Sequence, residues 1–363
     1  MSPPGRPKGE YRSAQHEGTP VNAPVRVQVA VVNYRTGSLA VDCLRSLLPE
    51  VQALPGTQVT VVDNCSGDGS AEVIEAAIAA EGWTGWARLH RAPVNGGFSY
   101  GNNQVVRPAL AVNDPPAYFW LLNPDTQVQP GALRALVDFM QAHPRVGIAG
   151  SSYLLGNDEP WPYAFRFPSI WSELANGLRL SLVGKLLKNR VGLRRMGDQP
   201  EQVDWLPGAS MLVRREVFEA AGLMDEGYFL YYEETDFSLA ALHAGWETWY
   251  VPQSCVKHFV GQSTGVSGHH AGLKRRPQYW FDSRRRYWVK NHGRFYAAAT
   301  DVVWAMAFST WKLRNLIQRK QADYPPYFFR DLLRNSALFH SGLPTSTAAS
   351  QTAHGHSNHS AQR

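Results

Sequence analysis

Cysteine is scarce in this 363-residue sequence: its three residues, Cys43, Cys65 and Cys255, lie far apart and form no CxxC pair. A sparse and odd set argues against a disulfide framework and against a thiolate zinc site, and it suits a reducing compartment. The sequence also has no run of about 18 apolar residues, so it predicts no transmembrane helix.

Residues 1–24 lack the apolar core of a signal peptide. They are polar and rich in Pro and Gly, which predicts a flexible leader, and residues 341–363 predict a disordered tail. A hydrophobic content of 44% is enough for a sizeable core. The net charge of +6 indicates acidic partners, and nucleic acid, anionic lipid headgroups and sugar diphosphates all remain open.

Strand-like and helix-like segments alternate through the first 150 residues. Strands are predicted at 25–33, 57–62, 87–90, 117–122 and 146–150, and helices at 39–48, 69–80, 99–111 and from Pro130 onward. This alternation predicts an α/β fold with a mostly parallel sheet flanked by helices. Ligands of such sheets bind at the carboxyl ends of the strands.

Polar residues fall at these predicted strand ends: Asn33, Asp63, Asn64, Asn123 and Asp125. Each could instead cap the helix that follows, but polar residues at three strand ends together favour a binding site. Asp125 follows a hydrophobic strand and could be a carboxylate ligand of Mg²⁺ or Mn²⁺ beside a diphosphate. Asn-Pro-Asp alone is also a common turn signal.

An aromatic run leads into three carboxylates, Glu233, Glu234 and Asp236. Glu233 and Asp236 are three residues apart and share a helix face, while Glu234 points elsewhere. A carboxylate beside bound substrate can accept a hydroxyl proton. Further on, His258 precedes a Gly/Ser-rich loop whose backbone donors could hold phosphate, although a lone histidine is usually structural.

Two basic segments lie outside the strand–helix alternation. Residues 156–200 predict an insertion with a basic, partly amphipathic helix, suited to a membrane surface or an anionic acceptor. Residues 295–320 combine Trp, Phe and Val with Lys and Arg, which predicts a helix in the plane of a membrane surface. The alternatives are an ordinary solvated helix for the first segment and a packed core helix for the second.

Seven motifs in the sequence together resemble the family 2 glycosyltransferases of the GT-A fold, especially their bacterial rhamnosyltransferase-like branch. They occur in the family's order within residues 27–295: VVNYRT (31–36), VDNCS (62–66), NGGFSYGNN (95–103), LLNPD (121–125), GAS (208–210), EETD (233–236) and HFVGQST (258–264). Residues 279–293 also resemble the aromatic, arginine-rich stretch that follows the catalytic domain in this branch.

The resemblance implies a Rossmann-like GT-A catalytic domain at 25–270 and a C-terminal segment of amphipathic, membrane-surface helices at 271–340. It implies a nucleotide-sugar site formed by Asn33, Tyr34, Asp63, Asn64, Asn95, Phe98, Asn103, Asn123 and Gly208. Asp125 and His258 match the ligands of a divalent metal, Mg²⁺ or Mn²⁺. Glu234 matches the catalytic base, and Glu233, Asp236 and Trp205 are expected to contact the acceptor.

Two positions depart from the family's pattern. Asn123 stands where the first acid of the metal-binding DxD motif is expected, which leaves one carboxylate fewer for the metal. Glu234 stands where Asp is more usual, so its carboxylate reaches one methylene further.

The reaction expected from the resemblance is inverting sugar transfer to a glycan or lipid-linked acceptor by a peripheral protein on the inner face of the plasma membrane. The resemblance favours dTDP-rhamnose as the donor, with UDP-sugars close behind. The oligomeric state stays open.

Other classes of protein fit the sequence less well. A nucleotidyltransferase would need a Gly-rich basic loop after the first strand, where residues 33–37 offer one glycine and one base. A dinucleotide-dependent oxidoreductase would need GxGxxG after Val32, which is absent. A nucleic-acid-binding protein would account for the charge but not for the acid cluster or His258, so no nucleic-acid partner is expected.

Overall fold

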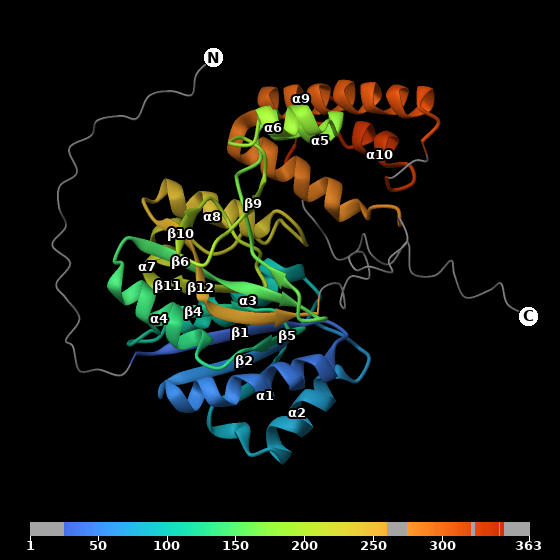
Figure 1. Cartoon of the computed structure of the whole chain (residues 1–363). Helices are drawn as coiled ribbons and strands as arrows, with labels where there is room; N and C mark the ends of the chain where they lie inside the picture. The colour runs from blue at the N-terminus through green and yellow to red at the C-terminus, as the bar shows by residue number, and fades with distance from the viewer. Residues whose placement is uncertain (1–24, 260–273, 321–323, 341, 345–363) are drawn as a thin grey trace, which may run out of the picture.

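The computed structural model describes residues 25–259, 274–320, 324–340 and 342–344. The predicted leader, nearly all of the predicted tail and residues 260–264 of the His258 motif lie outside the described residues. So does the expected domain boundary near residue 270, which stays a prediction. In the described part, helices cover both faces of one large sheet, and a separate helical layer lies to one side of it (Figure 1).

The large sheet has the strand order β10-β12-β6-β11-β4-β1-β2-β3, with β5 paired to β12 and β7 paired to β6. Its strands are β1 (Val27–Asn33), β2 (Thr57–Asp63), β3 (Ala87–Arg91), β4 (Tyr118–Leu122), β5 (Thr126–Val128), β6 (Val146–Leu155), β7 (Pro160–Trp161), β10 (Glu201–Val203), β11 (Ser210–Arg214) and β12 (Glu247–His258). β1 to β4 are mutually parallel, and β12 is parallel to β6, whereas β11 runs antiparallel to both β4 and β6. The predicted α/β fold with a mostly parallel sheet is confirmed.

Both faces of the sheet are buried, which explains why β1 is apolar almost throughout and shows no alternation. One face packs against α1 (Gly37–Ala53), α2 (Ser70–Ala80) and α4 (Ala132–Ala142). The other packs against α3 (Gly97–Leu110), α7 (Arg215–Ala221) and α8 (Glu233–His243). A short 3₁₀ turn, Trp83–Gly85, precedes β3.

The segment 156–200 was predicted to hold a single basic helix, but it contains strands as well as helices. It holds β7, a two-stranded sheet of β8 (Tyr163–Phe165) and β9 (Leu193–Arg195), and two short helices, α5 (Ile170–Leu178) and α6 (Ser181–Leu186). A capping box between Ser169 and Ser172 starts α5. Arg179, in the left-handed region at φ 49°, ends it and separates it from α6.

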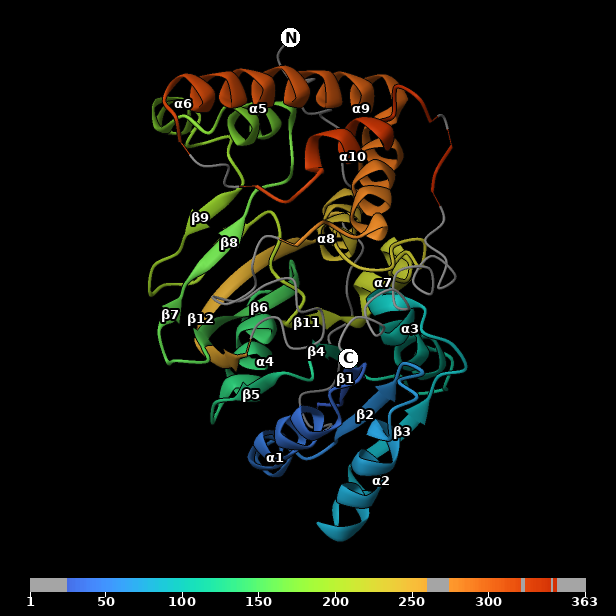
Figure 2. The same cartoon turned by 90° about the vertical axis from the view of Figure 1, so that its right-hand side faces the viewer.

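The long C-terminal helix α9 (Gln278–Ile317) is divided at Gly293, whose backbone is not helical (φ 81°, ψ 161°). Its first half packs on α8 through Tyr287 and Trp288, and its second half packs against α5 and α10 (Phe328–Arg334). We call the second half of α9 (residues 294–317), α5, α6 and α10 the helical platform; it forms the layer along the top of Figure 2. Within the described ranges, no helix is both long and apolar enough to cross a membrane.

Candidate active site

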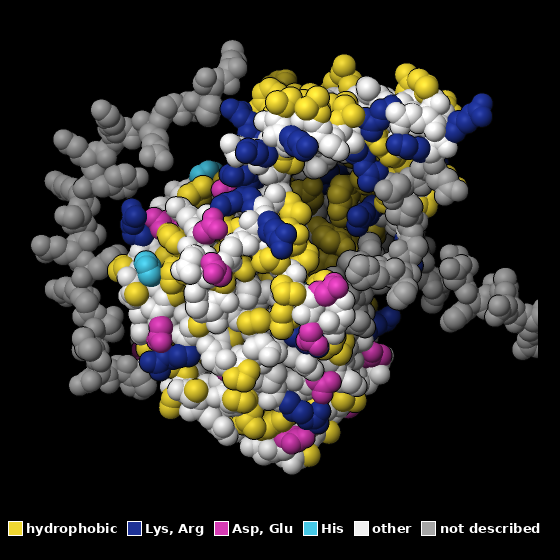
Figure 3. Space-filling model, viewed as in Figure 1, with side chains coloured by type: hydrophobic (Ala, Val, Ile, Leu, Met, Phe, Trp, Pro, Cys, Tyr) yellow, Lys and Arg dark blue, Asp and Glu magenta, His cyan; other side chains and the backbone are white. Residues whose placement is uncertain are grey.

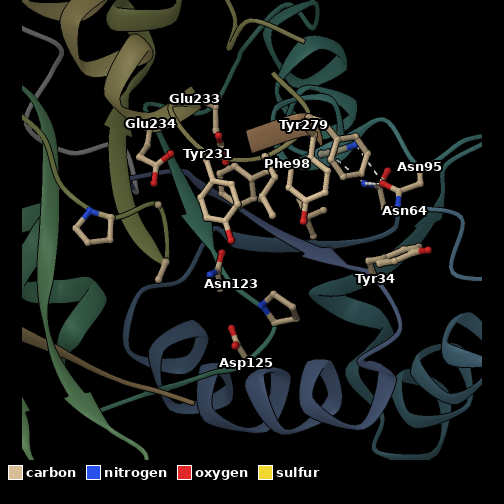
Figure 4. Close-up of a pocket in the computed structure, with 18 of the residues that line it drawn as sticks. Tyr34, Asn64, Asn95, Phe98, Asn123, Asp125, Tyr231, Glu233, Glu234 and Tyr279 are labelled. Carbon is tan, nitrogen blue, oxygen red and sulfur yellow. Dashed lines mark hydrogen bonds between the residues drawn. The ribbon is translucent and has the colours of Figure 1, made fainter. Parts of the chain in front are cut away.

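A cavity of about 360 Å³ opens at the carboxyl ends of β1, β2 and β4 (Figure 4). The predicted site residues in its wall are Tyr34, Asn64, Asn95, Phe98, Asn123, Asp125, Gly208, Glu233, Glu234 and His258. In Figure 4, Glu233 and Glu234 lie at one side of the cavity and Asn64, Asn95 and Tyr34 at the other. Residues that are far apart in sequence therefore line the same cavity.

Asn64 organises the loop on the side of the cavity away from the acids. Its side-chain amide donates to Asn95 Oδ1 (2.9 Å) and to the carbonyl of Gly97 (3.1 Å). Asn95 Oδ1 also accepts the backbone N–H of Gly97 (3.2 Å). These bonds hold the loop that carries Phe98 against the cavity.

Gly97 is where the two sides of the cavity touch. It has φ +86°, and a Cβ atom there would lie 2.0 Å from the carbonyl oxygen of Phe229. That carbonyl accepts the N–H of Phe98 at 3.0 Å. Only glycine permits this approach, which joins the Asn95–Phe98 loop to the segment leading into Glu233.

Asn33 and Asp63 lie beneath the cavity and do not line it. They face each other across β1 and β2, and Asn33 Nδ2 donates to Asp63 Oδ1 at 2.8 Å. Asp63 Oδ2 accepts the N–H of Ser66, and Asn33 Oδ1 accepts from Thr36. Their polar atoms shape the two loops that follow these strands, so their expected nucleotide contacts stay predictions.

Asp125 and His258 meet because β5 and β12 pair with Thr126 opposite His258. His258 Nε2 lies 3.3 Å from Asp125 Oδ1 and 3.5 Å from the amide nitrogen of Asn123. One carboxylate and one imidazole suit a divalent cation that takes its remaining ligands from a diphosphate. Within the described ranges no group of three or more His, Cys, Asp or Glu is arranged to hold a metal ion.

Glu233 and Glu234 begin α8 behind two residues with left-handed backbone, Tyr231 (φ 72°) and Tyr232 (φ 70°). Burial raises the pKa of Glu234 to about 7, although hydrogen bonds from the backbone at Glu234 and Gly208 oppose it. Burial, and then the charge of Glu234, raise the pKa of Glu233 well above its ordinary value. Among the described residues, Oε2 of each has no hydrogen-bond partner, so both can accept or donate a proton in the cavity.

Asp236 faces α9 instead of the cavity. Its carboxylate accepts the hydroxyl of Tyr228 (3.1 Å), Nζ of Lys290 (2.6 Å) and the amide of Asn291 (2.7 Å). Lys290 also bridges to Asp225, on the other side of the same cluster. Asp236 thus fastens α8 to α9, and its expected acceptor contact stays a prediction.

Asn103 and Trp205 also lie outside the cavity wall. The Asn103 amide donates to the carbonyl of Met224 and to Glu226, both at 2.8 Å. The Trp205 ring stacks on Phe165, and its Nε1 donates to the carbonyl of Arg166 at 3.0 Å. The roles expected for these two residues stay predictions.

Several cavity residues carried no predicted role. Phe229, Tyr231 and Tyr279 form an aromatic wall beside the acids, with the Tyr231 and Tyr279 rings stacked 6.1 Å apart. The aromatic run before Glu233 and the stretch beginning at Tyr279 were both visible in the sequence. The contact between these two segments was not visible in the sequence, because it depends on α9 folding back onto α8.

A curled, mostly parallel sheet with a cavity at its strand ends is the architecture of the GT-A fold. The profile of the glycosyltransferase-like family 2 matches residues 24–303, so the chain belongs to this family. The resemblance found in the motifs is confirmed.

Two relatives show the breadth of this family. An N-acetylglucosaminyl-diphospho-decaprenol L-rhamnosyltransferase of Mycobacterium tuberculosis is 29% identical over 230 residues, covering 58% of this chain and 71% of the relative. The low-salt glycan biosynthesis hexosyltransferase Agl10 of Haloferax volcanii is 26% identical over 223 residues, covering 59% of this chain and 61% of the relative.

Two solved structures share this fold. GalNAc-T7 with UDP, GalNAc and Mn²⁺ superposes with a TM-score of 0.54 at 15% identity, over 86% of this chain and 57% of that chain. The mannosyltransferase PcManGT from Pyrobaculum calidifontis, in complex with GDP-Man and Mn²⁺, gives 0.50 at 14% identity, over 92% and 84%. At these identities the likeness shows the fold alone.

Proposed function

We propose that this protein is an inverting, metal-dependent glycosyltransferase that moves a sugar from a nucleotide-sugar to a hydroxyl of a lipid-linked or polysaccharide acceptor. The observation that carries the proposal is the shared cavity, in which Glu234, with a pKa of about 7, and the Asp125–His258 pair occupy different walls. A base and a diphosphate site on separate walls are what an in-line displacement at a sugar carbon requires.

The donor would occupy the side of the cavity formed by Tyr34, Asn64, Asn95 and Phe98, with its diphosphate toward Asp125 and His258. Asp125 and His258 would hold Mg²⁺ or Mn²⁺, which when bound supplies neutralising charge to the leaving diphosphate. Asn123 would add an amide beside them and no second carboxylate.

Glu234 would act as the base for the acceptor. Its carboxylate takes the hydroxyl proton as the acceptor oxygen bonds to the anomeric carbon. The bond from that carbon to the diphosphate breaks on the opposite face, and the nucleoside diphosphate leaves. Burial and the charge of Glu234 raise the pKa of Glu233 and favour its neutral form, which can donate a hydrogen bond to the acceptor.

We favour dTDP-rhamnose as the donor, with UDP-sugars as the alternative. The name of the mycobacterial relative supports rhamnose and an acceptor on a diphospho-polyprenol, whereas the haloarchaeal relative is a hexosyltransferase. A lipid-linked acceptor would place the reaction at the inner face of the plasma membrane, on a peripheral protein engaged in glycan assembly.

The proposal is tested with dTDP-rhamnose, UDP-glucose, UDP-N-acetylglucosamine, UDP-galactose and GDP-mannose, each with and without Mn²⁺, by thermal shift. We expect one donor to raise the melting temperature in a metal-dependent way, because a ligand that binds only the folded state stabilises it. Asp125→Ala should abolish the metal-dependent part of that shift.

Glu234→Gln separates chemistry from binding in the same assay. It should keep the donor shift and lower turnover about 10²–10⁴-fold, the usual contribution of a general base. Loss of the donor shift along with turnover would make Glu234 a binding residue. Release of pyrophosphate instead of nucleoside diphosphate would contradict glycosyl transfer and favour a nucleotidyltransferase.

A further inference from the structure

We propose that the second half of α9 and helix α6 form one docking surface for a lipid bilayer with anionic headgroups. We call this set of exposed apolar side chains the docking surface: Leu182, Leu186, Phe295, Val302, Met306, Leu313, Leu316 and Ile317. The proposed function enters only in the role of this surface, which is to bring the cavity to a lipid-linked acceptor.

The α9 part of the docking surface is a continuous stripe. Phe295, Val302, Met306, Leu313 and Ile317 are spaced by seven, four, seven and four residues, which keeps them on one side of a helix. All are exposed, and Phe295 keeps 90% of its surface accessible. A stripe of this length is far beyond the scattered single apolar residues that ordinary protein surfaces carry.

The opposite side of the same helix is already buried. Trp304, Phe308 and Trp311 pack against Tyr324 and the aromatic residues of α10. The interior of the platform therefore accounts for one apolar side of α9, and the outward stripe has no counterpart within the described residues. A helix that is apolar on two opposite sides needs two apolar environments.

Helix α6 extends the docking surface beside the C-terminal end of α9. Arg314 donates to the carbonyl of Arg179 at 3.4 Å, and the Arg179 guanidinium lies 4.9 Å from the Trp311 ring centre. Arg179 lies just before α6, so these contacts bring the start of α6 to the last turns of α9, and Leu182 and Leu186 (76% exposed) are the exposed leucines of this short helix. Figures 1 and 2 both show α6 along the outer edge of the platform.

The charge around the docking surface is of one sign. Residues 174–190 and 302–320 contain no Asp or Glu, and they carry these cations: Arg179, Lys185, Lys188, Arg190, Lys312, Arg314, Arg319 and Lys320. The acids of the helical platform are all buried: Glu173 and Asp301 pair with Arg284, each at 2.5 Å, and Asp331 pairs with Arg275. Figure 3 shows hydrophobic side chains along this edge of the molecule with Lys and Arg beside them.

An apolar stripe bordered by cations and free of exposed acids matches an anionic bilayer surface, where the apolar side chains enter the interface and the cations meet the headgroups. The occupant also fits the position of the cavity. Tyr279, in the first turn of α9, lines that cavity, so a protein docked through α9 has its cavity fixed relative to the bilayer.

The test is flotation of the full chain with vesicles of phosphatidylcholine alone or with phosphatidylglycerol. The apolar variant is M306S/L313S/I317S and the charge variant is K185E/K188E/K320E. The matched control is V73S/V112S, which changes two exposed valines of the α/β domain. We expect flotation only with phosphatidylglycerol, a loss of at least tenfold in each docking variant, and no loss in the control.

Docking variants that float like the unchanged chain would overturn the proposal. So would a change from dimer to monomer on size exclusion without any effect on flotation, which would make a second copy of the chain the occupant. Donor thermal shifts, measured without vesicles, must be retained in every variant to show an intact fold. Flotation without any donor shift would contradict the proposed function and leave the docking surface standing.

Discussion

Glu233 and Glu234 are adjacent in sequence, yet their carboxyl groups meet different surroundings. Each receives a hydrogen bond from its own backbone, but Glu233 is buried and the charge of Glu234 further disfavours its ionised form, whereas Glu234 is half-buried and has an additional backbone hydrogen bond at Gly208. Two neighbouring carboxylates in a low-dielectric cavity do not both ionise readily. Because the Glu234 charge is among the causes that raise the pKa of Glu233, Glu234 is the first of the pair to lose its proton.

The pH profile of transfer follows from this order. Because only the Glu234 carboxylate can accept a proton, kcat/KM should fall as the pH drops through about 7. Glu233→Gln should leave this limb in place, since Glu233 is uncharged while Glu234 titrates. The measurement is kcat/KM from pH 5 to 9 for both proteins. A limb that shifts below pH 6 in the Glu233→Gln enzyme would show that Glu233 is charged.

The motifs predicted the residues that point into the cavity better than those around it. Asp125 follows a strand, His258 ends one, and Glu234 lies in the first turn of a helix, and all three line the cavity. Asp236 shares a helix face with Glu233 but turns to Lys290, which lies 54 positions further along the chain. No local pattern reveals a partner at that separation.

Helix α8 is held from outside by the first half of α9. Lys290 bridges Asp225 and Asp236, and Asn291 adds an amide to Asp236. These contacts act directly on the helix that carries both cavity acids. The aromatic wall, with Tyr279 from α9 against Tyr231, adds a second attachment at the same end.

Asp236→Asn tests this attachment. We expect it to lower the free energy of unfolding by about 1–3 kcal/mol, because a buried hydrogen-bonded carboxylate is replaced by a weaker partner. The matched control is Asp138→Asn, which breaks an exposed pair with Arg134 and should cost less than about 1 kcal/mol. Urea unfolding of both variants gives the comparison, and equal losses would show that Asp236 has no special role.

Strands and helices of the α/β part were predictable because each carries its own periodicity. Strand β11 was not predicted, since it lies after the insertion and enters the sheet antiparallel between β4 and β6. The division of the insertion into α5 and α6 was also missed. It depends on the left-handed backbone of Arg179, a residue without a turn preference.

A buried charge network joins the helical platform to the first half of α9. Arg284, in the first half of α9, pairs with Asp301 in the second half and with Glu173 in α5, each at 2.5 Å. Asp301 also accepts Ser336 Oγ (2.7 Å) and the N–H of Ala337 (2.8 Å). Segments more than 100 residues apart converge on one guanidinium, an arrangement that no stretch of sequence displays.

Arg284→Met should therefore destabilise the protein by about 3–5 kcal/mol, because it leaves two buried carboxylates without their counter-charge. The unpaired acids would have raised pKa values in the folded state, so the stability lost at neutral pH should be partly regained toward pH 5. Urea unfolding at pH 5 and 7.5 measures this. Arg284→Met with Glu173→Gln and Asp301→Asn should recover part of the loss at pH 7.5, and a loss under 1 kcal/mol in the single variant would contradict the argument.

The break in α9 at Gly293 has a geometric consequence. From Tyr279 to Gly293 the helix runs 14 residues, a rigid rod of about 21 Å at 1.5 Å per residue. In the docking that we propose, the length of this half-helix would set the distance between the bilayer and the hydroxyl that reacts in the cavity. An acceptor would then be selected by the distance from its lipid anchor to its reacting hydroxyl as well as by its sugar. The angle between the two halves of α9 at Gly293 would set that distance.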